Sequence, residues 1–221
     1  MSKGGEYTKD VILAWRAMRF FLRYNRSVNF DPQKRGRRSI RLQGYDYSQA
    51  GAYYVTVVSQ LRKCFFGEVI HGEMRTNDAG KMIQAVWESM PQRFPTVELG
   101  AFIAMPNHFH GIIVIHENVG AGLVPAPDDS TTNMATTRVA PTNNSRPTLG
   151  KVIGAFKSIT THEYIKGVDE LGWAQFYKCL WQRNYYEHII RDVDEWNHIH
   201  LYIESNPSAW DVDEENPIHE R

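Results

Sequence analysis

Apolar residues along the chain fall into short runs with strand character and longer stretches with helical spacing. Residues 52–58, 97–104 and 108–115 are rich in β-branched and aromatic side chains, which is typical of buried strands. The segment 64–70 holds two further short apolar clusters and is expected to be the hairpin partner of the first strand. The pattern therefore predicts a sheet of short antiparallel strands.

Four other segments carry apolar residues at the three- and four-residue spacing of amphipathic helices. Asn77 is a suitable N-cap for the second of these helices, and Asp192 for the last. Glu195 follows Asp192 by three residues, as in a capping box, and Pro207 ends the last helix. The four segments span residues 9–24, 77–94, 149–164 and 192–206.

The order of these elements predicts an α+β fold, with an antiparallel sheet and helices packed on one of its faces. We expect this domain to cover residues 41–210. Residues 117–147 are dominated by small and polar residues and by proline, which favours a flexible insert without a core of its own. Residues 1–40 are expected to be a basic N-terminal extension, and residues 211–221 an acidic tail.

Charge is uneven along the chain although the net charge is zero. Residues 1–42 carry eleven Lys or Arg against three acidic residues, a net charge of +8, whereas residues 211–221 carry −4. A basic arm beside a neutral body suits binding to a phosphate backbone. A solvated extension explains the same charge equally well.

Composition excludes several classes of protein. An apolar share of 42% supports a real core and argues against a disordered chain. Cys64 and Cys179, the only two cysteines, provide neither a disulfide framework nor a cysteine-rich zinc site, which suits a reducing cytosol. The apolar residues near the N-terminus are interrupted by arginines too early for a signal peptide or a membrane span. We therefore expect a cytoplasmic protein.

Two histidines stand at the start of the strand 108–115. In a strand, side chains two positions apart share one face, so His108 and His110 point the same way and Phe109 points to the other side. Two imidazoles on one face form half of a metal site. From the residues alone, two ordinary polar side chains on a half-exposed strand remain an equally good interpretation.

A second His-x-His pair, His198 and His200, falls in the last predicted helix. On a helix, residues two apart diverge by about 200° and do not chelate one ion. The first pair is therefore the better candidate for a metal site.

Tyr202 and Asn206 lie four residues apart at the end of the last predicted helix and share one of its faces. A tyrosine oxygen, an amide oxygen and two histidines form a coherent set for phosphodiester chemistry. A metal held by His108, His110 and the Asn206 oxygen would polarise a phosphate, and Tyr202 would attack the phosphorus. A boundary tyrosine and a helix-ending asparagine explain the same spacing without any chemistry.

Two motifs carry a resemblance to a known family. The segment 105–111, Met-Pro-Asn-His-Phe-His-Gly, resembles the His-hydrophobic-His (HUH) motif of single-tyrosine transposases. The segment 180–191, Leu-Trp-Gln-Arg-Asn-Tyr-Tyr-Glu-His-Ile-Ile-Arg, followed by Tyr-Ile-Glu-Ser-Asn-Pro at 202–207, is similar to REP-associated tyrosine transposases. The resemblance covers about residues 38–210, with both motifs in the family's order.

The resemblance implies a ferredoxin-like fold, a divalent metal (Mg²⁺ or Mn²⁺), and cleavage of single-stranded DNA at the foot of a hairpin. His108 and His110 match the metal-binding pair, Asn206 the residue that completes the metal site, and Tyr202 the nucleophile. Cleavage would leave a 5′-phosphotyrosine and a 3′-hydroxyl that can be rejoined. No nucleotide cofactor is implied, and the oligomeric state stays open.

Other residues are candidates for supporting roles. Glu187 and His188 match a recurring pair of the family, which we expect near the site without assigning its chemistry. Tyr185 and Tyr186 suit packing or stacking on DNA bases rather than nucleophilic attack. Lysines on the helix after the insert suit contact with nucleic acid, although a solvated helix face is the usual explanation. Candidate DNA contacts are Arg37, Arg38, Lys151, Lys157, Arg183, Tyr185 and Tyr186.

Two segments have no counterpart in the family pattern, the basic extension and the insert at 120–147. Neither removes a candidate catalytic residue, so both affect only the expected DNA specificity. Two alternatives to a strand-transfer enzyme remain. One is a domesticated, non-catalytic protein that binds hairpin DNA, and the other is a metal-dependent phosphoesterase that uses water and does not need Tyr202.

Overall fold

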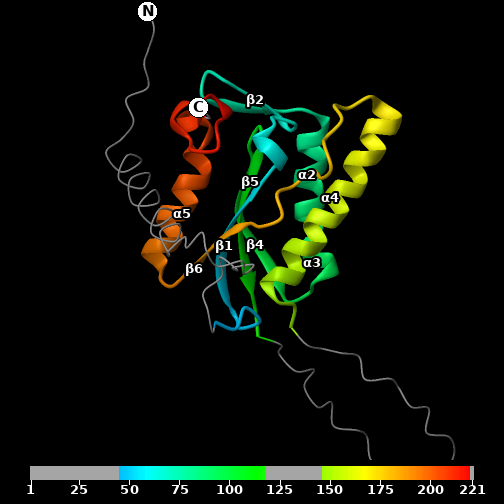
Figure 1. Ribbon diagram of the computed structural model, residues 1–221. Helices are drawn as coiled ribbons and strands as arrows, with labels where there is room; N and C mark the ends of the chain where they lie inside the picture. The colour runs from blue at the N-terminus through cyan, green and yellow to red at the C-terminus, as the bar shows by residue number, and fades with distance from the viewer. Residues whose placement is uncertain (1–44, 118–145, 220–221) are drawn as a thin grey trace, which may run out of the picture.

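A four-stranded antiparallel sheet forms the centre of the protein. The computed structural model describes residues 45–117 and 146–219, which form one layered α+β unit (Figure 1). The strand order is β4-β5-β1-β6, so the two most buried strands lie in the middle. The strands are β1 (Gly51–Val58), β4 (Val97–Ala104), β5 (His108–Ile115) and β6 (Tyr186–Ile190).

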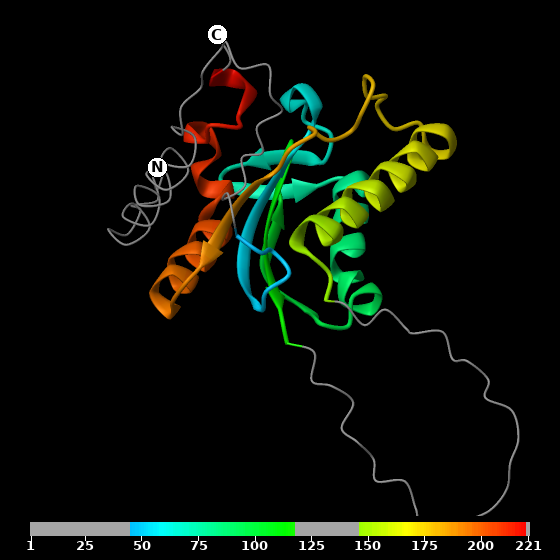
Figure 2. The same ribbon diagram turned by 60° about the horizontal axis from the view of Figure 1, so that its bottom comes forward.

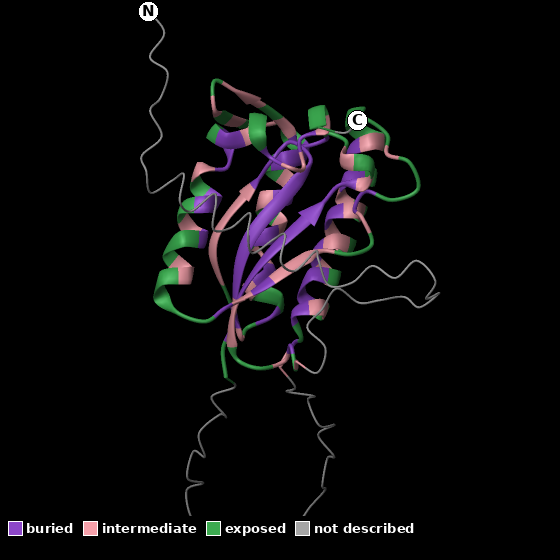
Figure 3. Ribbon diagram, turned by 60° about the vertical axis from the view of Figure 1, so that its left-hand side comes forward, coloured by how far each residue is buried: buried purple, intermediate pink, exposed green. Residues whose placement is uncertain are grey.

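The predicted strands 52–58, 97–104 and 108–115 are confirmed as β1, β4 and β5. β1 and β5 are buried on both faces, because helices cover both sides of the sheet (Figure 3). Gly111 in β5 lies under Trp87, and a Cβ atom at this position would approach the Trp87 ring to 2.5 Å. A glycine directly after the histidine pair therefore lets the largest core side chain pack against the sheet.

Two helices cover one face of the sheet. They are α2 (Asp78–Glu88), extended by the short α3 (Met90–Arg93), and α4 (Leu149–Leu171) (Figure 2). The Asn77 side chain caps α2 by accepting a hydrogen bond from the Gly80 amide at 2.9 Å, which confirms the predicted cap. Trp87 and Phe156 from these helices pack on Phe109 of β5, with ring centroids 4.6 and 5.1 Å away.

Helix α5 (Val193–Ser205) packs on the opposite face, whereas the helices were expected on one face only (Figure 2). β1 and β5 carry apolar side chains on both faces of the sheet. The face with Tyr54 and Ile112 is buried only if a helix packs on it as well. Asp192 caps α5 by accepting from the Glu195 amide, as predicted. Two 3₁₀ turns follow α5, η2 (Pro207–Val212) and η3 (Pro217–His219).

The predicted hairpin between β1 and the segment 64–70 is wrong. β1 pairs with β5 on one side and β6 on the other, so it has no free edge for a third partner. The chain instead turns at η1 (Gln60–Arg62), and β2 (Gly67–Ile70) pairs with β3 (Glu73–Thr76) in a separate two-stranded sheet. His71 and Gly72 between them both have positive φ, the geometry of a tight hairpin turn.

The four main strands and the helices between them follow the order β1-α2-β4-β5-α4-β6, which is the ferredoxin-like βαββαβ topology. The α+β class and the antiparallel sheet are thus confirmed. None of the helices in the described ranges is long and apolar enough to cross a membrane. The predicted helix 9–24, the basic extension with Arg37 and Arg38, and most of the predicted insert lie outside the described residues.

Candidate metal centre and nucleophile

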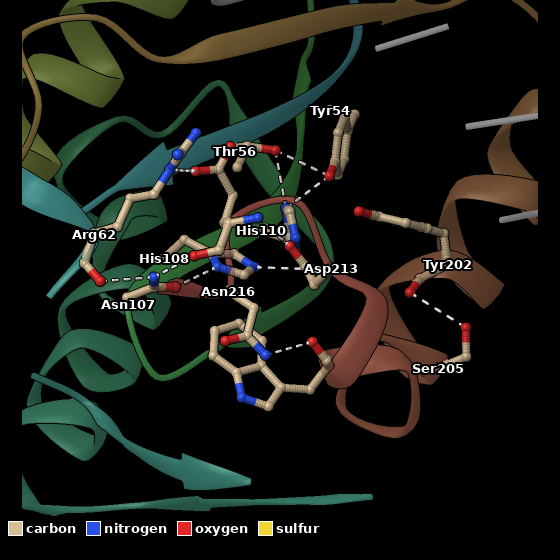
Figure 4. Close-up of polar contacts among 12 residues, drawn as sticks. Tyr54, Thr56, Arg62, Asn107, His108, His110, Tyr202, Ser205, Asp213 and Asn216 are labelled. Atoms are coloured by element: carbon tan, nitrogen blue, oxygen red, sulfur yellow. Dashed lines mark hydrogen bonds and ion pairs between the residues drawn. The ribbon is translucent and has the colours of Figure 1, made fainter. Parts of the chain in front are cut away.

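His108 and His110 lie side by side on the face of β5 that α5 covers (Figure 4). Their ring centroids are 4.4 Å apart, and Phe109 between them points into the opposite layer. Both imidazoles are buried, with exposed fractions of 0% and 2%. The interpretation as polar side chains on a half-exposed strand therefore does not apply.

Asn107 determines which nitrogen of His108 carries the proton. The Asn107 Nδ2 donates to the backbone oxygens of Arg62, at 2.9 Å, and Glu215, at 2.6 Å. Its Oδ1 is therefore an acceptor, and the His108 Nδ1, 2.8 Å away, donates to it. This leaves the Nε2 of His108 with a lone pair, the form that binds a metal.

Tyr54 and Thr56 from β1 surround the Nδ1 of His110. The Tyr54 hydroxyl lies 2.6 Å from this nitrogen, and the Thr56 hydroxyl lies 2.9 Å from it. Thr56 is directly opposite His110 in the antiparallel register. The sequence signal for this contact is the threonine within the otherwise apolar run 52–58.

Asp213 is the third group of the cluster. Its Oδ2 lies 4.0 Å from the His108 Nε2, and candidate ligand atoms of His108, His110 and Asp213 all lie within 4.8 Å of one another. Asp213 is 3% exposed although it belongs to the segment expected as an acidic tail. The sequence offers no local signal for this position, because the contact depends on how the chain turns after α5.

Two contacts hold the segment after α5 against the site. The Arg62 Nε forms an ion pair with the Glu215 Oε2 at 2.7 Å, and Asn107 donates to the Glu215 backbone. The Trp210 ring in η2 lies over His108, with ring centroids 5.9 Å apart. Residues 210–216 therefore lie against the histidine pair.

Tyr202 and Asn206 come from the C-terminal end of α5, and both are buried, with exposed fractions of 4% and 0%. The Tyr202 ring lies 5.4 Å from the His110 ring and 6.1 Å from the Tyr54 ring, edge-on to both. Asn206 is close enough to His108 and to Tyr202 to affect the pKa values of both. The structure thus brings together all four residues that the two motifs singled out.

Burial dominates the electrostatics of the centre. It lowers the pKa of His108 to about 4 and the pKa of His110 well below its usual value. His108 next to His110 lowers the pKa of His110 further. Burial also raises the pKa of Tyr202 well above 10. At neutral pH both imidazoles are therefore neutral, and the tyrosine keeps its proton.

The low histidine pKa values predict that stability falls in weak acid. The unfolded chain binds a proton near pH 6.5, whereas folded His108 binds one only near pH 4. The stability that neutral His108 contributes is complete above pH 6.5 and is lost as the pH falls from 6.5 through 4. At pH 4 the free energy of unfolding is lower by about 3 kcal/mol. We expect urea unfolding with chelator present to show this loss in wild type and a smaller one in His108→Gln. If the free energy of unfolding fell equally with decreasing pH in both proteins, the prediction would be contradicted.

The residues present fit a divalent cation. The Nε2 atoms of His108 and His110 are buried and make no hydrogen bond within the described parts of the chain. His108 directs its lone pair toward the Asp213 carboxylate, an arrangement in which two acceptors face each other. A cation between them removes this conflict, and imidazole with carboxylate is a usual ligand set for transition metals.

Glu187 and His188 lie on opposite faces of β6, so only His188 belongs to the layer of the candidate site. The His188 Nε2 lies 3.3 Å from the Glu195 Oε2, and Glu195 also accepts from the Arg191 amide at 2.8 Å. These contacts connect β6 to the first turn of α5. His188 therefore helps to fix the helix that carries Tyr202. The second histidine pair, on α5, lies outside the cluster.

The candidate DNA contacts differ in their surroundings. Lys151 and Arg183 are exposed, and Tyr186 at the start of β6 is half-buried. Tyr185 packs against the core, with the Lys157 ammonium 5.4 Å from its ring centre. Contact of these residues with DNA stays a prediction.

Lys157 has an internal role. Its ammonium donates to the backbone oxygens of residues 182, 183 and 184 at 3.0, 3.4 and 2.9 Å, while burial lowers its pKa to about 8. We expect Lys157→Met to lower the free energy of unfolding by about 2 kcal/mol, because three carbonyls lose a charged donor. Lys151→Met, exposed on the same helix, serves as the control in urea unfolding and should change stability by less than about 0.5 kcal/mol. Equal stability of the two variants would refute this role.

No protein-family model matches the chain. A structure described as a REP-associated tyrosine transposase bound to a REP hairpin has a TM-score of 0.47 and 18% identity, covering 76% of this chain and 72% of the other. A putative transposase from Deinococcus radiodurans has a TM-score of 0.36 and 13% identity, covering 74% of this chain and 95% of the other. The TM-score and the sequence identity are low for both structures.

One relative is much more similar in sequence. A Haemophilus influenzae protein, described as uncharacterized, is 37% identical over 179 residues. The match covers 80% of this chain and 92% of that protein, so it includes nearly the whole relative. The chain therefore belongs to the same family as this Haemophilus influenzae protein.

Proposed function

We propose that the protein is a metal-dependent single-tyrosine endonuclease that cuts and rejoins single-stranded DNA at hairpins, as in DNA transposition. One observation carries this proposal. The Tyr202 ring is buried 5.4 Å from the ring of His110, which belongs to a cluster of two histidines and a carboxylate. A tyrosine held beside a candidate metal site is the arrangement that phosphotyrosine chemistry requires. The motif resemblance supplies the substrate class.

The proposed metal ligands are the Nε2 atoms of His108 and His110, with Asp213 and the Asn206 oxygen as the oxygen donors. When bound, a divalent cation would polarise the scissile phosphate and favour the ionised form of the adjacent tyrosine. Because two of the donors are imidazoles, we expect Mn²⁺ to bind more tightly than Mg²⁺, which prefers oxygen ligands.

In the proposed reaction, the Tyr202 oxygen attacks the phosphorus and the bond from phosphorus to O3′ breaks. The products are a 5′-phosphotyrosine and a free 3′-hydroxyl. The phenol loses one proton and the leaving oxygen takes up one, so the step consumes neither water nor a redox partner. Attack of a 3′-hydroxyl on the phosphotyrosine reverses the step and rejoins the strand.

Access to the centre has a structural requirement. Because Tyr202 and both histidines are buried, we propose that residues 210–216, which lie against His108, move away from β5 to admit a DNA phosphate. The ion pair of Arg62 with Glu215 is among the contacts that this movement breaks. We propose that the exposed cations Lys151 and Arg183 help to bind the DNA backbone, since Lys and Arg neutralise phosphates.

The test is incubation of the full chain with hairpin DNA from the flanks of its gene. The DNA is labelled at the 3′ end, because the fragment attached to the tyrosine carries that end. We expect a labelled protein band that survives denaturation, forms with Mn²⁺ or Mg²⁺, and is absent with chelator or with the same DNA as a perfect duplex. Hairpin binding that is salt-dependent but gives no adduct would indicate a non-catalytic binding protein, and cutting without an adduct would indicate a phosphoesterase that uses water.

A further inference from the structure

Tyr54 in the central strand β1 packs beside both His110 of the candidate metal centre and the candidate nucleophile Tyr202, with ring centroids 5.6 and 6.1 Å away (Figure 4). Its side chain is 0% exposed, and its hydroxyl lies 2.6 Å from the His110 Nδ1. The Tyr202 hydroxyl is close enough to hydrogen-bond with the Tyr54 hydroxyl. One buried oxygen therefore contacts both halves of the site.

The directions of these hydrogen bonds follow from the role of His110. An imidazole that binds a cation through Nε2 carries its proton on Nδ1 and must donate it. The Tyr54 oxygen, at 2.6 Å, is the nearer acceptor, since the Thr56 oxygen is at 2.9 Å. Thr56 itself donates to the Tyr54 oxygen at 3.0 Å. Both lone pairs of that oxygen are then used, so its own O–H is left to donate to the Tyr202 oxygen once Tyr202 has lost its proton. Without the cation, the hydrogen bond with Tyr54 instead raises the pKa of Tyr202, which donates to Tyr54.

We infer that Tyr54 is a positioning residue that connects His110, as a metal ligand, to the oxygen of Tyr202. The inference rests on the proposed function, because it assumes a cation on His110 and attack by Tyr202. Its O–H holds the attacking oxygen beside the metal centre, and this hydrogen bond strengthens as negative charge develops on that oxygen. Its oxygen also fixes the ring of His110 with the Nε2 facing His108 and Asp213.

The neighbouring Tyr53 shows that a tyrosine at position 54 is not explained by packing alone. Both rings are fully buried in β1, but they point to opposite faces of the sheet. The Tyr53 hydroxyl reaches the rim of its layer, where it donates to the Gln49 backbone at 3.0 Å. Among the described residues, the Tyr54 hydroxyl hydrogen-bonds with groups of the centre alone, and burying a hydroxyl is costly unless it has such partners.

The experiment compares Tyr54→Phe with Tyr53→Phe in the full chain. Mn²⁺ binding is measured by calorimetric titration, and adduct formation by single-turnover reaction with the labelled hairpin. We expect Tyr54→Phe to weaken Mn²⁺ binding by about 10- to 100-fold and to slow adduct formation further at saturating Mn²⁺, since it loses the contacts to His110 and to Tyr202. Tyr53→Phe should change neither quantity.

A second variant keeps the inference testable if Tyr54→Phe does not fold. Thr56→Val removes the weaker partner of His110 and leaves Tyr54 in place, so we expect a smaller loss of Mn²⁺ affinity, below about 10-fold. A folded Tyr54→Phe with wild-type Mn²⁺ affinity and adduct rate would overturn the inference. A larger loss of Mn²⁺ affinity in Thr56→Val than in Tyr54→Phe would also overturn it. If Tyr54→Phe does not fold, a loss of Mn²⁺ affinity above about 10-fold in Thr56→Val would overturn it as well.

The same data separate this inference from the proposed function. A wild-type protein that binds Mn²⁺ but forms no adduct would refute the enzyme, while a weaker Mn²⁺ affinity of Tyr54→Phe would still support the contact with His110. A wild-type protein that forms the adduct, with no change in Tyr54→Phe, would refute the positioning role alone. A wild-type protein that binds no Mn²⁺ would refute both.

Discussion

Tyr202→Phe is expected to abolish the covalent adduct between the protein and hairpin DNA. The substitution removes only the hydroxyl oxygen, which is the proposed attacking atom, and keeps the ring that packs against Tyr54 and His110. Loss of a nucleophile cannot be compensated by its neighbours, so we expect at least about a 1,000-fold decrease in adduct formation. The measurement is the labelled band on a denaturing gel after incubation with Mn²⁺.

The matched control for this prediction is Tyr186→Phe. Tyr186 is a half-buried tyrosine at the start of β6, within the other motif segment. It pairs with Thr56 across the sheet, on the face of the candidate site, but it is neither a proposed ligand nor the proposed nucleophile. We expect this variant to form the adduct at close to the wild-type rate. Full activity of Tyr202→Phe, or loss of the adduct only in Tyr186→Phe, would refute the assignment. Hairpin binding should survive in Tyr202→Phe, because binding depends mainly on backbone contacts.

Replacing both His108 and His110 with alanine is expected to abolish metal binding and, with it, cleavage. The two imidazoles supply the only buried Nε2 lone pairs in the candidate cluster. Loss of a supporting partner typically weakens metal binding by about 10- to 100-fold, so loss of two ligands should exceed 100-fold. Calorimetric titration with Mn²⁺ measures the affinity, and circular dichroism checks that the variant is folded.

The second histidine pair provides the control for this variant. His198 is exposed and His200 half-exposed on α5, outside the cluster. A variant with both replaced by alanine should keep the wild-type Mn²⁺ affinity. If instead this variant loses Mn²⁺ and the variant at 108 and 110 does not, the metal centre has been assigned to the wrong pair.

Two further variants separate the proposed oxygen ligands. Asp213→Asn removes a negative charge but keeps the side-chain volume, and Asn206→Ala removes the amide. We expect the larger loss of Mn²⁺ affinity for Asp213→Asn, because a carboxylate binds a divalent cation more strongly than an amide does. A larger loss for Asn206→Ala would make the amide the principal oxygen donor.

The local pattern of the sequence was sufficient for much of the fold. β4 and β5 have the predicted bounds, and the caps Asn77 and Asp192 bind the amides that the spacing indicates. Strand periodicity also put His108 and His110 on one face, which is a property of the backbone itself. Helical spacing similarly put Tyr202 and Asn206 together.

Long-range pairing could not be predicted in the same way. The segment 64–70 has the composition of a partner for β1, but both edges of β1 are taken by strands that lie far along the chain. Helix positions were similarly underdetermined, since an amphipathic α5 fits either face of a sheet that is apolar on both. Non-local contacts of this kind depend on the whole topology and not on local propensity.

The sequence by itself determined the two halves of the candidate site, the histidine pair on a strand and the tyrosine with its asparagine on a helix. Only the tertiary structure brought these halves together, because α5 packs on the face of β5 that carries the histidines. It also added Tyr54, Thr56 and Asp213, which are ordinary residues until strand pairing and the turn after α5 bury them beside the imidazoles. Periodicity sets which way a side chain points, whereas burial against distant segments decides what it meets.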